Sequence, residues 1–189
     1  SSTFLSGCST FGAISNSKIP AEQASPGYSI QSVLSSKPRG NVTLVLAFSG
    51  GGSRAAALAY GVLEELRDTH VQGNGHTYRL LDEVDVISSV SGGSFTAAYY
   101  GLHGDQTFKK FENIFLRQDI STILIENIFN PMLWFSNKGR TDRAIELYET
   151  SVFKDATFAD LQKKNGPLIV INASDLGNGI RFSFTQEYF

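Results

Sequence analysis

The sequence has only one cysteine, Cys8, among its 189 residues, which excludes a fold held together by internal disulfides. It also has no basic run, and its formal net charge is −2. We therefore expect no nucleic-acid partner. No apolar run reaches the roughly 18–20 residues that a membrane-spanning helix needs, since the richest stretch, residues 120–135, is interrupted by polar residues and a proline. The length suffices for one globular domain with a substantial core.

The first residues differ in kind from the rest of the chain. Leu5-Ser6-Gly7-Cys8 fits a bacterial lipobox, in which a signal peptidase cuts before a cysteine that then carries lipid. We therefore interpret residues 1–8 as the remnant of a signal peptide and Cys8 as a lipidation site. Residues 9–40 are rich in Ser, Gly and Pro and are interpreted as a linker or N-terminal arm. This predicts a lipid-anchored protein of the bacterial cell envelope, at the outer membrane or periplasmic face.

Beyond residue 40, β-prone apolar runs alternate with helical patterns. The first run, residues 41–48, suits a strand that is buried on both faces. The elements expected next are a helix over 54–68, a Gly-rich loop over 71–78, a helical turn over 80–84, a strand over 84–90 and a helix over 92–102. Further helices are expected over 108–115, from 120 onward, over 140–151 and from the N-cap Thr157 to 164, followed by a strand over 168–173 and a hairpin partner over 180–185. Strands and helices joined by long crossovers indicate an α/β layered fold.

The segment around Ser91 has the pattern of a nucleophile elbow. A short apolar strand leads into Ser89-Val90-Ser91-Gly92-Gly93, and a helix follows. The usual signature is G-x-S-x-G, in which the serine lies at a strained corner and the outer residues must be small. Ser89 replaces the first glycine and is still small. The pattern predicts that Ser91 is a nucleophile.

A triglycine follows the first strand, and its backbone amides could bind an anion at a helix N-terminus. A P-loop is excluded, because no Gly-Lys-Ser/Thr follows. Gly50, Gly52 and Ala55 do satisfy the dinucleotide fingerprint G-x-G-x-x-[GA], but the next strand ends in serines and not in the acidic residue that would hold a ribose. An oxyanion hole that serves Ser91 is therefore favoured, and a dinucleotide-binding domain remains the alternative.

The triglycine with Ser53 and Arg54, and the elbow about forty residues later, resemble the patatin-like phospholipases. The flanking segments 55–66 and 95–100 look like the bacterial lipoprotein branch of that family. The resemblance covers residues 41–189 and implies a three-layer αβα fold with a mainly parallel central sheet, incomplete at its C-terminus. It also implies hydrolysis of lipid or phospholipid acyl esters, of phospholipase A or lysophospholipase type, by a Ser–Asp dyad that needs no metal and no cofactor.

The resemblance implies a role for each residue that matches the motifs. Ser91 would attack the ester carbonyl, and water would later hydrolyse the acyl-enzyme. Arg54 and Gly93 would support the site, although an ion pair with a carboxylate of the fold is an equal alternative for Arg54. The oxyanion loop would consist of Gly50, Gly51, Gly52 and Ser53.

The family's catalytic aspartate lies in an Asp-Gly-Gly or Asp-Gly-Ala motif, and this chain has none. None of its nine aspartates is followed by glycine. Asp175, in Asp-Leu-Gly, is the nearest imitation and is interpreted as a hairpin-loop residue. We expect the catalytic aspartate to lie beyond Phe189, in a C-terminal remainder of the same protein, so that residues 1–189 alone do not hydrolyse esters.

Two further alternatives remain at this point. A Ser–His–Asp hydrolase would need a histidine near Ser91, but His70 and His76 flank a polar loop and His103 ends a helix about 18 Å away. A non-catalytic, membrane-anchored module could keep the same fold for binding or assembly. The aromatic residues of the central segment are interpreted as core, with part of the segment a candidate acyl-chain pocket or membrane contact: Phe108, Phe111, Phe115, Phe129, Trp134 and Phe135.

The lipobox generates a prediction about the native protein. Intact-mass measurement of material purified from its own host is expected to show lipid on Cys8 and no residue before it, because the peptidase cuts there. An unmodified Cys8 with its upstream residues retained would contradict the prediction.

Overall fold

The structure is a computed structural model that describes residues 42–73, 75–118, 148–175 and 177–184, together with Gln31 and Ser35. Several expectations fall outside these residues: the lipidation site Cys8, the other residues of the arm over 9–40, and the helices expected from 120 to 147.

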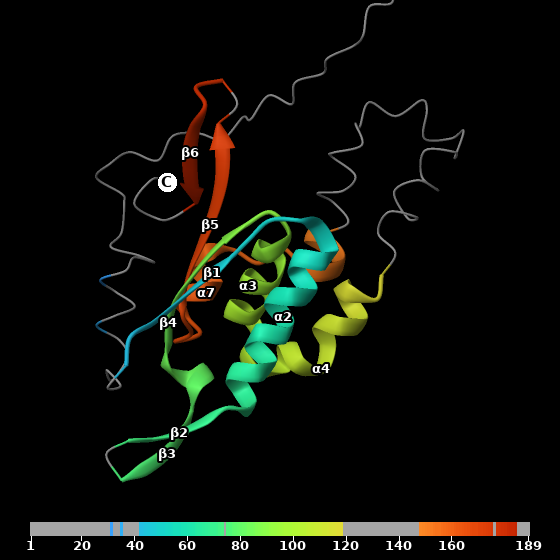
Figure 1. The fold of residues 1–189 in the computed structure, drawn as a ribbon. Helices are drawn as coiled ribbons and strands as arrows, with labels where there is room; N and C mark the ends of the chain where they lie inside the picture. Colours follow the sequence, from blue (N-terminus) through green and yellow to red (C-terminus); the bar gives the residue numbers. More distant parts are fainter. Residues whose placement is uncertain are drawn as a thin grey trace, which may run out of the picture.

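A four-stranded sheet in the order β1-β4-β5-β6 forms the centre of the described structure (Figure 1). β1 (Leu44–Phe48) pairs in parallel with β4 (Val84–Val90), and β4 pairs in parallel with β5 (Leu168–Asp175). β6 (Ile180–Phe184) closes an antiparallel hairpin with β5, as the sequence predicts. The expected α/β fold with a mainly parallel sheet is confirmed, and it is consistent with a patatin-like αβα architecture.

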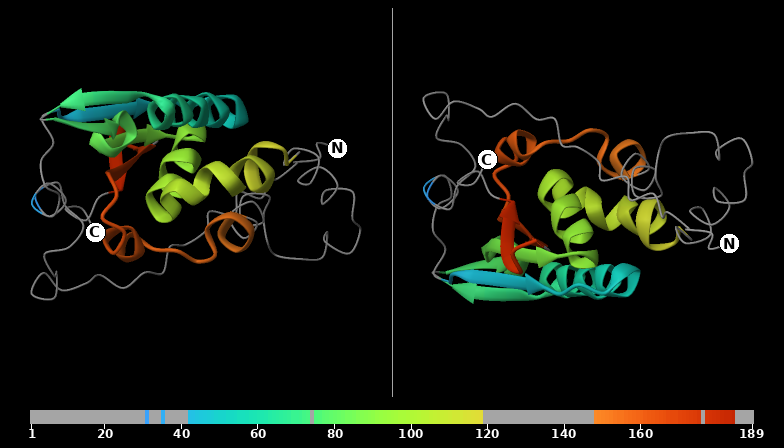
Figure 2. Two further views of the ribbon diagram at one scale, coloured as in Figure 1. Left: turned by 90° about the horizontal axis from the view of Figure 1, so that it is seen from below. Right: turned by 90° about the horizontal axis from the view of Figure 1, so that it is seen from above.

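Helix α3 (Gly92–His103) packs on the sheet and lies between α2 (Gly52–Asp68) and the segment that contains α7 (Phe158–Gln162) (Figure 2). α3 continues through a 3₁₀ turn, η3 (Gly104–Gln106), into α4 (Thr107–Phe111) and a π-helical turn, η4 (Glu112–Leu116). A second π-helical turn, η6 (Glu149–Phe153), contacts η4. Among the helices of the described part, none has both the length and the apolar character to cross a bilayer.

Two groups of buried side chains form the core of the described part of the chain. The larger group joins the sheet to α2, α3 and α7 and includes Leu63, Ile87 and Ile169, which are fully buried. The second group is mainly aromatic and joins α2, α3, α4, η4 and η6. Phe111 and Phe115 belong to it with 0% and 3% exposure, so the interpretation of these two aromatics as core residues is confirmed.

The prediction of a Gly-rich loop over residues 71–78 is wrong. The chain forms a β-hairpin there, with β2 (His70–Gly73) antiparallel to β3 (His76–Arg79), followed by a 3₁₀ turn, η2 (Leu80–Glu83). Gly73 ends β2, Gly75 lies in the turn with φ 78°, and Val71 pairs with Tyr78 across the hairpin. Residues of high β-propensity flank a short glycine turn, which is a hairpin pattern and not a loop pattern.

β1 also differs from its expectation, because it starts at Leu44 and is buried on one face only. Successive strand side chains point to opposite faces. Phe48 lies in the core at 8% exposure, whereas Val45 on the other face is 59% exposed.

The N-cap predicted at Thr157 is confirmed at the start of α7. The Asp160 carboxylate accepts hydrogen bonds from the Thr157 backbone N–H at 3.0 Å and from its hydroxyl at 2.9 Å.

The packing of α2 yields a prediction on stability. Leu63→Ala removes a fully buried side chain and is expected to lower the free energy of unfolding by about 2–5 kcal/mol in urea denaturation. Leu58→Ala is the matched control on the same helix, because Leu58 is 67% exposed and should cost less than about 0.5 kcal/mol. Similar costs for the two substitutions would contradict this packing.

Candidate active site

The register of the parallel strands brings the triglycine and the elbow together. Phe48 of β1 pairs with Ser89 of β4, and Gly50 and Ser91 each lie two residues further along the chain from that pair. Both strands therefore end at the same edge of the sheet, where α2 and α3 begin (Figure 1). A Cβ atom built on Gly50 would lie 3.2 Å from the Cβ of Ser91, so the two turns are in contact. The carboxyl edge of such a sheet is where ligands bind in open α/β folds.

Ser91 lies at a strained corner between β4 and α3. Its backbone has φ 49° and ψ −123°, and it is the N-cap residue of α3. A non-glycine residue in such a conformation costs about 1–3 kcal/mol, which the surrounding structure must offset. The side chain is exposed. These features are those of a nucleophile elbow, in which the strain presents the hydroxyl.

Gly92 and Gly93 are required by the close approach of the two turns. A Cβ on Gly92 would overlap the carbonyl oxygen of Gly52. A Cβ on Gly93 would lie 2.7 Å from the carbonyl oxygen of Ser49 and 2.7 Å from the Cβ of Phe48. Real Cβ atoms essentially never lie within 3.0 Å of another heavy atom in this way, so a side chain at either position would separate the elbow from the triglycine turn.

The triglycine turn has a backbone that only glycine adopts readily. Gly51, the N-cap of α2, has φ 137°, and Gly52 has φ 65°. In the described structure no side chain caps this helix, and its first turn has no acidic residue. The N–H groups of a first helical turn have no partner within the helix, and the helix dipole is positive there. This end of α2 therefore favours a negative charge supplied by a ligand.

Ser53 and Arg54 follow in the first turn of α2, and both are exposed. Arg54 makes no ion pair with any carboxylate among the residues that the structure describes. The ion-pair alternative for Arg54 is thus not seen in this part of the chain, and its side chain is available beside the triglycine turn.

Hydrogen bonds from β5 hold the end of β4 in place. The Asn172 amide nitrogen donates to the Ser88 hydroxyl and to the Ser89 carbonyl, both at 3.0 Å, and its amide oxygen accepts from the Ser183 hydroxyl at 2.8 Å. The Ser89 hydroxyl is buried and donates to the Val170 carbonyl at 3.1 Å. A serine at the first motif position is therefore accommodated with its hydrogen bond satisfied. Sequence reasoning missed Asn172, although a polar residue in an apolar strand was a signal.

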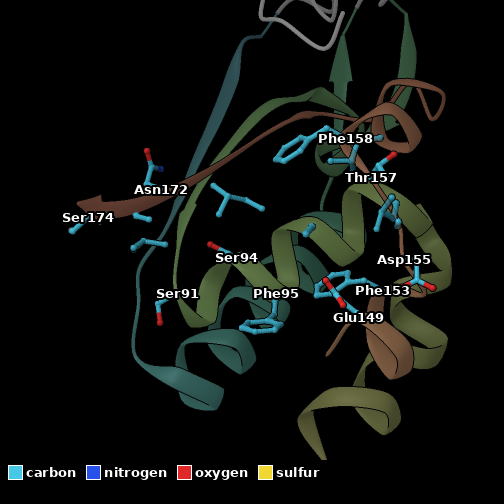
Figure 3. A pocket seen from close by; sticks show the side chains of 17 residues that line it. Ser91, Ser94, Phe95, Glu149, Phe153, Asp155, Thr157, Phe158, Asn172 and Ser174 are labelled. Atoms are coloured by element: carbon cyan, nitrogen blue, oxygen red, sulfur yellow. The ribbon is translucent and has the colours of Figure 1, made fainter. Parts of the chain in front are cut away.

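A cavity of about 860 Å³ begins at Ser91 and extends along α3 (Figure 3). One wall is the face of α3, another is the carboxyl half of β5, and a third is the segment from η6 to α7. Ser94 lies on the first wall, and its hydroxyl oxygen is buried without a hydrogen-bond partner among the described residues. The cavity could not be predicted from the sequence, because its walls come from three segments far apart in the chain. The aromatics suggested for an acyl pocket do not line it where they are described; Phe95, Phe153 and Phe158 do.

The candidate bases are not paired with Ser91. The Ser91 hydroxyl makes no hydrogen bond to a carboxylate or an imidazole among the described residues. Asp175 is the last residue of β5, and its carboxylate accepts hydrogen bonds from two residues of the β5–β6 turn, the Asn178 amide at 2.6 Å and the Gly177 N–H at 2.8 Å. These two donors lower the pKa of the Asp175 carboxyl. Asp175 thus belongs to the hairpin, but as a paired strand residue and not as the loop residue that the sequence suggested.

The histidines lie away from the elbow. His70 and His76 belong to the β2–β3 hairpin, at the opposite end of α2 from the triglycine turn (Figure 1). His103 is the last residue of α3, and its ring lies 4.3 Å from that of Tyr99. Burial, and then nearby lysines, lower the pKa of His103. No histidine of the described residues is therefore positioned as a base for Ser91.

Within the described ranges, no group of three or more His, Cys, Asp or Glu side chains is arranged to hold a metal ion.

The contact between the two turns can be tested by adding a side chain at Gly92. Gly92→Ala places a methyl group where the Gly52 carbonyl lies, so the free energy of unfolding should fall by at least about 1–3 kcal/mol in urea denaturation. Gly61→Ala is the matched control, because Gly61 is also helical and nothing lies within 4 Å of its Cβ position. It should leave stability unchanged or raise it by up to about 1 kcal/mol. Equal effects of the two substitutions would contradict the contact.

The comparisons with known proteins agree with this geometry. The family model described as patatin-like phospholipase matches residues 46–187. No curated protein and no solved structure matches the chain. The resemblance inferred from the motifs is thereby confirmed, while the lipoprotein branch stays a prediction. Because the match spans most of the chain, the chain belongs to the patatin-like phospholipase family, a family of esterase type that acts on lipid substrates.

Proposed function

We propose that this protein is a serine lipid acyl hydrolase, of phospholipase A or lysophospholipase type, with Ser91 as its nucleophile. One observation carries the proposal: the exposed, strained Ser91 lies directly against the triglycine turn, at the end of a cavity. A serine hydroxyl, a set of backbone amides and a mostly apolar space are what cleavage of an acyl ester requires.

The proposed reaction has two halves. In the first, the Ser91 oxygen attacks the ester carbonyl while a base takes the hydroxyl proton, and the alcohol leaves with a proton, so that an acyl-enzyme remains. In the second, water attacks the acyl-enzyme and releases the fatty acid. In both halves the backbone amides at Gly50, Gly51, Gly52 and Ser53 stabilise the negative charge on the carbonyl oxygen. The dipole of α2 adds to this stabilisation, and no step needs a metal or a cofactor.

The proposed base is an aspartate outside the described residues. The resemblance implies a Ser–Asp dyad, and no described carboxylate is hydrogen-bonded to the Ser91 hydroxyl. The missing Asp-Gly motif supports the same conclusion.

The proposed site of action is a membrane surface. A lipidated Cys8 would anchor the protein in the bacterial cell envelope, and the residues up to 40 would link the anchor to the catalytic domain. Lipid substrates would then reach Ser91 from the bilayer that holds the enzyme.

The proposal predicts that Ser91 carries the activity. In the protein as its gene encodes it, Ser91→Ala should lower phospholipid and p-nitrophenyl ester hydrolysis by at least about a thousandfold, because the attacking oxygen is lost. A fluorophosphonate label should form a covalent adduct on Ser91 that peptide mass mapping can locate.

Ser151→Ala is the control variant, since Ser151 is an exposed serine that does not line the cavity. It should keep both the activity and the label. A stable, folded protein whose Ser91 takes no label and which hydrolyses no ester would contradict the proposal and favour a non-catalytic binding module. Activity that survives Ser91→Ala would assign the reaction to another residue.

A further inference from the structure

The cavity follows one face of α3 from the elbow onward. The lining residues of α3 and its N-cap are spaced as one stripe on a helix: Ser91, Ser94, Phe95, Ala98 and Leu102. Ser91 and Leu102 are eleven positions apart in the sequence, which places them about 16 Å apart along the helix axis. The cavity therefore has a direction, with the proposed nucleophile at one end.

The walls along this direction are mainly apolar. Val90 and Ile171 contribute from the strands, and Phe153, Phe158 and Leu161 contribute from the facing segment. Among the described residues of the lining, the two carboxylates, Glu149 and Asp155, belong to exposed residues of that same segment and not to the α3 wall (Figure 3). Such a lining favours a hydrocarbon over a charged head group.

Near the far end of the cavity, α3 packs directly against its neighbours. A Cβ built on Gly101 would lie 2.7 Å from the Leu161 side chain and 2.7 Å from the Ile169 side chain. At this level α3 therefore touches both α7 and β5. Midway along the stripe, Ala98 is the smallest of the α3 side chains that line the cavity and leaves room for a ligand.

We propose, on the basis of the proposed function, that the cavity holds a single acyl chain along α3 and that Ala98 and Leu102 determine its length. The ester carbonyl lies at Ser91, so the chain is measured from a fixed point. A C–C bond of ~1.5 Å advances an extended chain by roughly 1.3 Å, so about 16 Å accommodates about a dozen carbons. The enzyme accordingly prefers medium-length acyl esters.

The dependence of kcat/KM on acyl-chain length follows from the burial of methylenes. Each methylene that enters the cavity should raise kcat/KM about fourfold, until the chain meets Leu102 and Leu161. The full protein should therefore hydrolyse p-nitrophenyl laurate better than the butyrate and octanoate, and it should gain nothing further with the palmitate.

Two variants test the proposed control of acyl-chain length in opposite directions. Ala98→Leu fills the middle of the cavity and should lower the laurate-to-butyrate ratio of kcat/KM by at least about tenfold. Leu102→Ala lengthens the cavity and should move the optimum from laurate toward palmitate. Ala57→Leu is the matched control, because Ala57 is exposed on α2 outside the cavity, and its profile should equal that of the wild type.

The outcomes separate this inference from the function on which it rests. If no ester is hydrolysed in a Ser91-dependent manner, the proposed function is wrong and the inference falls with it. If Ser91-dependent hydrolysis is present but Ala98→Leu and Leu102→Ala leave the profile unchanged, the chain lies elsewhere and only the inference is wrong. Should Ala98→Leu fail to fold, the shift expected of Leu102→Ala decides alone.

Discussion

The contact between two glycine-containing turns is the constraint on which the site depends. The parallel pairing of β1 with β4 ends both strands at one edge, and Gly92 then lies against the carbonyl of Gly52 with no room for a side chain. Because backbone touches backbone there, Ser91 lies beside the triglycine turn with no intervening side chain. The N-termini of α2 and α3 meet at the same place, which concentrates unpaired amides and positive dipole ends around one hydroxyl.

This arrangement needs support, since the backbone of Ser91 is in a costly conformation. The support comes from the next strand. Asn172 of β5 binds the end of β4 through its amide and is itself held by Ser183 of β6, while the buried Ser89 hydroxyl bonds to β5. The hairpin β5–β6, which lies far along the sequence from the elbow, thus fixes the strand that presents the proposed nucleophile.

Sequence patterns predicted the elements well where one physical signal dominated. The short run rich in Val and Ile from 84 to 90 and the small residues at 91–93 predicted β4, the corner and α3, and the structure has them. The hairpin over residues 70–79 was not predicted, because its glycines were interpreted as a loop signal although β-prone residues flank them. The one-sided burial of β1 was also missed, since an apolar residue such as Val45 does not reveal what covers it.

The sequence by itself determined the residue types that the site needs: a serine between small residues, and a triglycine after a strand, at a spacing that allows one crossover helix. Local sterics and backbone freedom act over a few residues, so such motifs can be interpreted without coordinates. Only the tertiary structure decided that Gly50 meets Ser91, that Asn172 holds the elbow and that a cavity runs along α3. These features depend on strand register and on packing between distant segments, and no local pattern encodes them.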